Sequence, residues 1–482
     1  MEQILQQILV KTLTKIMEYY EKAGLSEIYV ITEDFKEIGN EMLREILCVF
    51  IENADKALCD EAKAERKAEG FTIKERGVPR SLYTALGEIE YSRTHFKAKG
   101  GGYAHILDRV LGVNAYERVD SGIGAQMVNN AASVSFGKSA AIATGGKISR
   151  QTAWKRMQEV GEVAYVPTRS GHTPETLHIF ADEDHVSLQD GKNAIVPLVT
   201  CCSGKEVVCK GRNALIDPVH IQGYGLAPDK HWGYVYAVMA EKYDLKKVKQ
   251  VFIYGDGARW IKAGFDVFGT AIHVLDAYHL DKRLRALLSG EICSAFAPRV
   301  RAAVDKGDRA AFQKLHCEMR DAVAGGMEIG KGRQKKLAAL RENASFLLAH
   351  WEAILNNRLP GSIGSCTEAQ VSHVLSKRLS RDPMGWSKAG LSKLAMVRVF
   401  RLNGGNVMPC DVSAGKVKNP DERTVIVNIS KYEDIIAKQY DDVFKGWRNW
   451  RWFEKDDDSL ISRKPSGTKT AVDALIKMRD IG

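Results

Sequence analysis

The sequence lacks any apolar stretch that approaches the length needed to span a bilayer, so we expect no membrane partner. The opening segment "MEQILQQILVKTLTKIMEYYEKAG" alternates apolar and polar residues at helical spacing, unlike the continuous apolar core of a secretory signal. None of the nine cysteines falls in CxxC spacing, which argues against a zinc site or a disulfide framework. These absences favour a globular protein of a reducing cytoplasm.

The composition that remains is that of a large globular chain. At 482 residues, with 45% hydrophobic and 27% charged residues, the chain is long enough for two to four domains. Residues 1–70 carry 15 acidic and 9 basic side chains, a net −6, so a total of +10 leaves +16 on the remainder. A basic body is typical of proteins that bind a polyanion, most often nucleic acid, although many basic proteins bind none.

Changes of pattern along the chain predict six regions. They are an acidic helical region (1–70), a small β-containing region (71–118), a helix-turn-helix region (119–170), an α/β core in two pieces (171–280 and 360–400), an all-α insertion (281–359) and a basic, aromatic C-terminal region (401–482).

The stretch "SVSFGKSAAIATGGKISRQTAWKRMQEVG" predicts two helices joined by a Gly145-Gly146 turn, the second capped by Ser149. This is the layout of a helix-turn-helix, in which the second helix reaches base edges and phosphates. Any helical hairpin with a glycine turn would have a similar pattern. The candidate DNA-binding residues are Arg150, Gln151, Thr152, Lys155 and Arg156.

The succession of strand-like and helical runs in residues 171–280 predicts a mixed sheet. The runs "LHIFADEDHVSLQ", "AIVPLVTCC" and "KEVVCKG" predict three antiparallel strands, and "QVFIYGDG" and "TAIHVLDAYHL" predict two parallel strands with helices between them. The predicted order is βββαβαβ, followed by a helix after the insertion, in an α/β fold.

Three carboxylates fall where this fold can bring them together. Asp182 and Asp184 share one strand face with apolar neighbours, while Glu183 points to the other. Asp256 ends the first parallel strand, where open α/β sheets place ligands, and Glu368 begins the helix after the insertion. Their oxygens are the hard ligands that Mg²⁺ or Mn²⁺ prefers, in the chemistry of two-metal phosphodiester cleavage.

Each carboxylate also has a structural interpretation. Asp256 lies in a Gly-Asp-Gly turn, Ser365 and Glu368 have the spacing of a capping box, and Asp182 and Asp184 would face solvent on an edge strand.

The segments "ADEDHVSLQ", "GDGARWIK", "DAYHLDK" and "TEAQVSHVLSKRLSRDPMGWS" resemble the motifs of the ISLre-two family of bacterial insertion-sequence transposases. That family belongs to the Mutator-like DDE group, which has an RNase H-like core, and the resemblance runs from about Tyr83 to the C-terminus. It implies that Asp182, Asp256 and Glu368 are the catalytic, metal-binding residues, with Asp184 in reserve for the first position. The accessory residues are Asp276 and His279, which resemble a [C/D]-x-x-H signature, and Trp351 in the insertion. His279 is alternatively a packed or helix-capping histidine. His373 and Arg378, on the helix of Glu368, either contact the scissile phosphate or are only solvated.

The resemblance implies Mg²⁺-dependent cleavage of double-stranded DNA at transposon ends and strand transfer into target DNA, with Mn²⁺ able to substitute. Two DNA ends must meet, so it implies a homodimer or a larger synaptic complex, in the bacterial cytoplasm at the nucleoid. The Trp447–Trp452 patch would hold flanking strands by stacking. The alternatives are a domesticated DNA-binding protein without catalysis and a structure-specific nuclease on the same fold.

Overall fold

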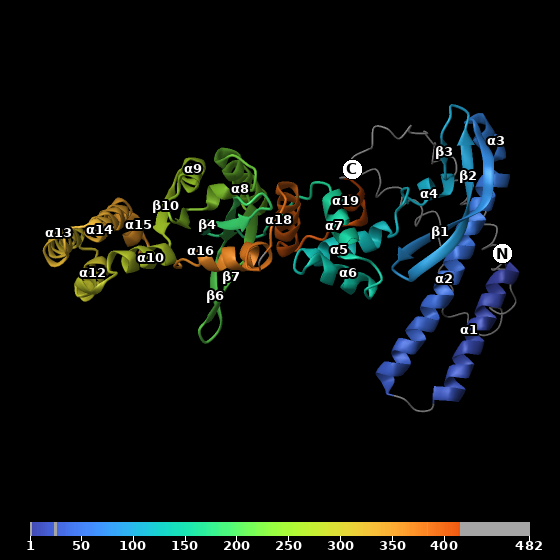
Figure 1. The fold of residues 1–482 in the computed structure, drawn as a ribbon, viewed down its shortest axis with the longest axis horizontal. Coiled ribbons are helices and arrows are strands. Elements are labelled where there is room, and N and C mark those ends of the chain that lie inside the picture. The colour runs from blue at the N-terminus through green and yellow to red at the C-terminus, as the bar shows by residue number, and fades with distance from the viewer. Residues whose placement is uncertain (1, 24–26, 383, 415–482) are drawn as a thin grey trace. The chain divides into compact units, whose positions relative to one another are not determined.

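The computed structural model describes residues 2–23, 27–382 and 384–414 (Figure 1). They fall into two compact units that divide between Arg118 and Val119, and each unit is described by itself. The expected strand "RTVIVNIS", the Trp447–Trp452 patch and the basic segment "SRKPSGTKT" lie outside the described residues.

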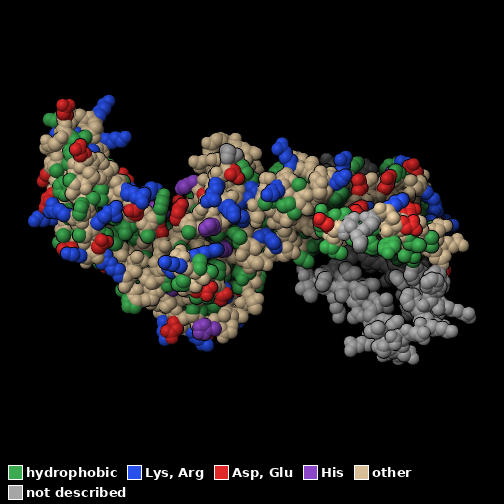
Figure 2. All heavy atoms as spheres, turned by 90° about the horizontal axis from the view of Figure 1, so that it is seen from below, with side chains coloured by type: hydrophobic (Ala, Val, Ile, Leu, Met, Phe, Trp, Pro, Cys, Tyr) green, Lys and Arg blue, Asp and Glu red, His purple; other side chains and the backbone are tan. Residues whose placement is uncertain are grey.

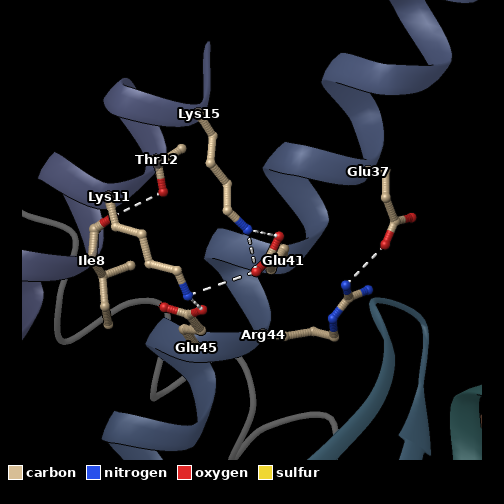
Figure 3. A network of polar contacts seen from close by, with 8 residues as sticks. All are labelled: Ile8, Lys11, Thr12, Lys15, Glu37, Glu41, Arg44 and Glu45. Carbon is tan, nitrogen blue, oxygen red and sulfur yellow. Dashed lines mark hydrogen bonds and ion pairs between the residues drawn. The ribbon is translucent and has the colours of Figure 1, made fainter. Parts of the chain in front are cut away.

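The first unit begins with a hairpin of two helices, α1 (Glu2–Ala23) and α2 (Ile28–Asp60). Lys15 pairs with Glu41 and Lys11 with Glu45, so the two helices run antiparallel (Figure 3). Two short helices follow, α3 (Lys63–Ala68) and α4 (Ile106–Val110). A three-stranded sheet has the order β1-β2-β3, with β1 at Phe71–Thr84, β2 at Gly87–Ala98 and β3 at Tyr103–Ala104. The side chains of Leu58, Phe71 and Phe96 form the centre of its core.

The second unit opens with three helices, α5 (Ser121–Ala131), α6 (Phe136–Thr144) and α7 (Arg150–Glu159). Gly145, at φ +58°, ends α6 in the left-handed conformation that glycine adopts without strain. These helices share a hydrophobic core with α18 (Lys388–Leu402), α19 (Pro409–Ala414) and two strands of the main sheet, β4 (Thr176–Ser187) and β5 (Asn193–Cys202).

The main sheet has five strands in the order β10-β9-β4-β5-β8. In sequence order they are β4 (Thr176–Ser187), β5 (Asn193–Cys202), β8 (Val219–Gln222), β9 (Gln250–Gly255) and β10 (Ala271–Leu275). The pairs β4–β5 and β5–β8 are antiparallel, whereas β9 runs parallel to both β4 and β10. The fold is therefore mixed α/β, with a mixed sheet.

The third strand of this sheet is not the one that the sequence pattern predicts. "KEVVCKG" falls in β6 (Gly204–Cys209), which pairs with β7 (Arg212–Ile216) in a separate two-stranded sheet. The place in the main sheet is taken by β8, whose four residues are too few to show a clear alternation. Gly211, at φ +78°, makes the hairpin turn that diverts β6.

Helices cover both faces of the main sheet. The face of Ile179 and Ala181 packs against α8 (Pro228–Lys242) and α9 (Arg259–Val267). The opposite face packs against the segment that follows the insertion, which contains α16 (Thr367–Val371), a π-helical turn (Ser372–Ser376) and α17 (Lys377–Leu379).

Residues 277–356 are helical and have a hydrophobic core of their own. The helices are α10 (Ala277–Leu287), α11 (Glu291–Ser294), α12 (Ala297–Lys306), α13 (Arg309–Gly326), α14 (Lys331–Ala349) and α15 (Trp351–Asn356). Figure 2 shows Lys and Arg side chains over this region, at the left of the view. Across the described ranges, no helix is both long and apolar enough to cross a membrane.

Candidate active site at the ends of the parallel strands

Three aspartates lie level with one another where β4, β9 and β10 run side by side. The parallel register pairs Phe180 with Tyr254 and Gly255 with Leu275. Continuing that register by two residues from the first pair and by one from the second sets Asp182, Asp256 and Asp276 in one row across the sheet.

Asp182 is a buried carboxylate, 8% exposed, that accepts a hydrogen bond of 2.9 Å from the Glu183 backbone N–H. Burial raises its pKa to about 6, and the negative charges of Asp256 and Asp276 add to that effect, while the hydrogen bond and the charge of His279 oppose it. A nearby cation would stabilise the ionised carboxylate of Asp182.

The alternation along β4 is as predicted. Glu183 lies on the opposite face, where its carboxylate accepts a hydrogen bond from the Trp260 indole N–H. Asp184 shares the face of Asp182 but is occupied by the Ser380 hydroxyl, which lies 2.9 Å from both of its oxygens. Because β4 is the central strand and both aspartates are buried, the edge-strand interpretation is wrong. The register sets Asp182, rather than Asp184, level with Asp256.

Asp256 sits in a turn that requires both of its glycines. A Cβ on Gly255 would lie 2.8 Å from the Ala181 carbonyl oxygen, and Gly257 has a φ of +76°. Asp256 Oδ1 accepts a hydrogen bond of 2.8 Å from the Ala258 N–H, which fixes the side chain at the start of α9. Asp256 is therefore both a turn residue and a half-buried residue of the candidate site.

Asp276 caps α10 and binds His279. It accepts hydrogen bonds from the His279 backbone N–H and ring Nδ1, both at 3.2 Å. Burial raises the pKa of Asp276, but the hydrogen bonds from His279 and Ser365 outweigh it and hold that pKa below its ordinary value. The hydrogen bond to Asp276 raises the pKa of His279, and the charges of Asp182 and Asp256 contribute.

The segment that leads into α16 is tied to Asp276 through Ser365, two residues before the helix begins. Ser365 Oγ donates a hydrogen bond to Asp276 and lies 2.7 Å from the hydroxyl of the buried Thr367. The N-cap of α16 is Cys366, whose side chain makes no capping hydrogen bond, and Ser365 Oγ accepts a hydrogen bond of 3.4 Å from the Thr367 N–H, so the capping box of Ser365 and Glu368 does not form. Glu368 is exposed in the first turn.

The donor chemistry of this site suits a hard divalent cation. Asp182, Asp256 and Glu368 offer carboxylate oxygens, and the charge of the buried Asp182, whose pKa burial raises, would be stabilised by a cation. In the part of the chain that the structure describes, no group of three or more His, Cys, Asp or Glu side chains is already arranged to hold a metal ion.

Two of the accessory residues named from the sequence, Trp351 and Arg378, are buried. Trp351 is buried in the core of the insertion, with its ring centroid 5.2 Å from that of Phe312. Arg378 is also buried and donates 2.9 Å to the Ala131 carbonyl, so it joins α17 to α5 and does not face a phosphate. The π-helical turn before it changes the face on which Arg378 falls. His373, in that turn, is exposed.

Helix α7 presents most of its predicted DNA-binding residues to solvent. Arg150, Gln151 and Lys155 are exposed and Thr152 is half-buried. Arg156 was expected on this face but is buried, donating 2.8 Å to the Val119 carbonyl and pairing with Glu159. Sequence reasoning missed Trp154, which is 41% exposed beside Lys155 and is the one large aromatic residue in an otherwise polar stretch.

Comparison with known proteins shows the family. The model of an uncharacterised protein family, UPF0236, matches residues 22–415. A UPF0236 protein of Caldanaerobacter subterraneus subsp. tengcongensis, whose name joins eleven locus designations, is 32% identical over 412 residues, covering 85% of this chain and 84% of the relative. A second UPF0236 protein of that organism is 32% identical over 80% of each chain. The UPF0236 protein in the vanSb 3′ region of Streptococcus gallolyticus is 22% identical over 78% of this chain and 83% of its own.

Proposed function

The chain belongs to the UPF0236 family, and we propose that it is a DNA transposase of the ISLre-two type, which cleaves and joins DNA strands with divalent metal ions at Asp182, Asp256 and Glu368. The proposal rests on one observation above the others. Asp182, Asp256 and Asp276 lie level across three neighbouring strands, and Ser365 ties the helix of Glu368 to the last of them.

The strand order supports an RNase H-like core. Three antiparallel strands are followed by two parallel ones in the order β10-β9-β4-β5-β8, and the helical region lies between β10 and the helix of Glu368. That is the arrangement that the resemblance to the Mutator-like group implies. One fold can carry unrelated functions, so it is the carboxylates that support catalysis.

The names of the relatives add independent support. One of them joins eleven locus designations of a single genome, and another joins four. Genes for one protein repeated in a genome are the expected result of an element that copies or moves itself.

The residues of this chain would have distinct roles. Asp182 on β4, Asp256 after β9 and Glu368 on α16 would hold the cations. Asp276 and His279 would keep the end of β10 and the start of α10 in place beside them. When bound, Mg²⁺ supplies Lewis-acid activation of the attacking oxygen and charge stabilisation at the leaving oxygen. Arg150, Gln151 and Lys155 on α7 would bind the element's ends, in a homodimer or larger complex that brings two ends together.

A strand-transfer assay tests this function. The substrate is a duplex ending in the inverted repeats that flank the gene, offered with supercoiled plasmid and Mg²⁺. Joining of the duplex to the plasmid, abolished by EDTA, is expected. A chain that binds the duplex but neither cuts nor joins it would be a DNA-binding protein only, and one that cuts without joining would be a nuclease.

A further inference from the structure

The β6–β7 hairpin stands away from the rest of the second unit (Figure 1). Among the residues that the structure describes, its strands pair only with each other, and all residues of β6 after Gly204 are exposed. The register shifts between Val207 and Cys209, which places Val208 in a bulge beside the turn at Lys210 and Gly211.

The base of this hairpin is attached next to the candidate active site. Lys205 Nζ donates a hydrogen bond of 2.8 Å to the Ile363 carbonyl, in the segment that leads to Glu368. Leu215, directly opposite Lys205, packs against the core of Phe180 and Tyr254, on the sheet face that carries Asp182. The hairpin therefore begins on the face where a DNA strand would meet the carboxylates.

The tip combines exposed apolar side chains with positive charge. Val207 and Val208 are 78% and 56% exposed, and so are the side chains of Lys210, in the turn, and Arg212, directly after it. Val207 lies on the same hairpin face as Lys205 and Leu215, because residues two apart on a strand share a face. That face rests on the core at the base and extends past it at the tip.

We propose that this hairpin is a DNA-binding arm, in which Lys210 and Arg212 bind backbone phosphates while Val207 and Val208 pack against bases unstacked near the cleaved strand. The proposal rests on the proposed function, since it names a second contact of the same site with DNA. A two-stranded ribbon fits a DNA groove, and apolar side chains wedge between base steps when basic neighbours hold the backbone. The positive charge at the tip favours DNA over a protein strand as the partner.

Binding measurements on the full chain separate the two contributions. The probes are a fluorescent duplex of arbitrary sequence and the same duplex with a central mismatched step, titrated over a series of NaCl concentrations. K210Q/R212Q should weaken binding to both duplexes by about tenfold and lower the slope of log affinity against log salt by about 2. V207N/V208N should remove the preference of the wild type for the mismatched duplex and leave binding to the perfect one. K246Q/K247Q removes the same charge from exposed positions elsewhere and should change neither measurement.

The rate at which the Cys209 thiol is modified gives a second measurement, which needs no mutation. Cys209 is an exposed thiol at the tip, so DNA should slow its modification by a maleimide, whereas the exposed Cys317 in the insertion serves as an internal reference. If the wild type binds neither duplex, the proposed function fails. If the wild type binds DNA, both hairpin variants bind it with the same affinity and Cys209 stays reactive, the hairpin is not a DNA-binding arm, and the proposed function is unaffected. Protection of Cys209 that rises with protein concentration in the absence of DNA would identify a second copy as the partner and overturn the arm.

Discussion

Ser365 donates a hydrogen bond to Asp276, although the two residues are separated by the whole helical insertion. Asp276 follows β10 and caps α10, so it belongs to the sheet, whereas Ser365 belongs to the segment that carries Glu368. This contact ties the start of the segment that carries Glu368 to the end of β10, on the far side of the insertion.

Ser365→Ala should slow DNA cleavage by about ten- to a hundredfold, because it releases the segment that positions Glu368. The Mg²⁺ concentration needed for half-maximal rate should rise as well, and Ser365→Thr should restore much of the activity. The matched control is Ser294→Ala, at an exposed serine in the insertion. If the Ser365→Ala protein cuts at the wild-type rate and with the wild-type Mg²⁺ dependence, Ser365 does not position Glu368.

Asp182→Asn should abolish cleavage yet stabilise the metal-free protein. The pKa of Asp182 is about 6 in the folded state and lies near 3.9 when unfolded, so ionisation of Asp182 costs stability as pH rises from about 4 to about 6. At pH 8 the substitution should raise the free energy of unfolding by about 1–3 kcal/mol in denaturant titrations with EDTA, and near pH 4 the gain should vanish. Asp266→Asn, at an exposed aspartate of α9, should show no such gain. Equal destabilisation of Asp182→Asn at both pH values would contradict this account of the site.

Substitutions on α7 should separate DNA binding from folding. Arg150→Ala with Lys155→Ala removes two exposed charges, so the salt slope of DNA binding should fall by about 2 with no change in the free energy of unfolding. Arg156→Ala should instead destabilise the fold by about 3 kcal/mol, because Glu159 and the Val119 carbonyl lose their buried partner. Electrophoretic shifts and denaturant unfolding measure the two effects, and the reverse pattern would place Arg156 at the DNA.

The second unit should lose stability in mild acid. Burial lowers the pKa of His178, His220 and His231 to about 4, so these side chains are neutral in the folded protein. A histidine with a depressed pKa contributes stability above its unfolded value of about 6.5, and that contribution is lost as pH falls toward 4, at most about 3 kcal/mol for each group.

Unfolding free energies measured between pH 7 and 4 test this. His220→Asn, which can keep a hydrogen bond to Thr200, should make the slope shallower, whereas His185→Asn, at an exposed position, should leave it unchanged. Equal slopes for all three proteins would exclude burial of His220 as a cause.

The local pattern of the sequence predicts what depends on near neighbours. The period of two along a strand predicts that Asp182 and Glu183 lie on opposite faces, and the glycines around Asp256 predict its turn. Long-range contacts decide the rest. Arg156 and Arg378 look like surface arginines in sequence, but each is buried and donates a hydrogen bond to a backbone carbonyl far away in the sequence, Val119 for Arg156 and Ala131 for Arg378. Likewise, the Asp276–Ser365 contact and the replacement of β6 by β8 in the sheet have no local signal.

The central claim is that Asp256 is one of three carboxylates that support metal-dependent DNA cleavage. The most direct measurement compares wild type, Asp256→Asn and the control Asp244→Asn for cleavage of a duplex carrying the gene's flanking repeats, with Mg²⁺ and with EDTA. The account predicts cleavage by wild type and Asp244→Asn in Mg²⁺ only, and none above background by Asp256→Asn, with DNA binding unchanged. Cleavage by Asp256→Asn at the wild-type rate would contradict it.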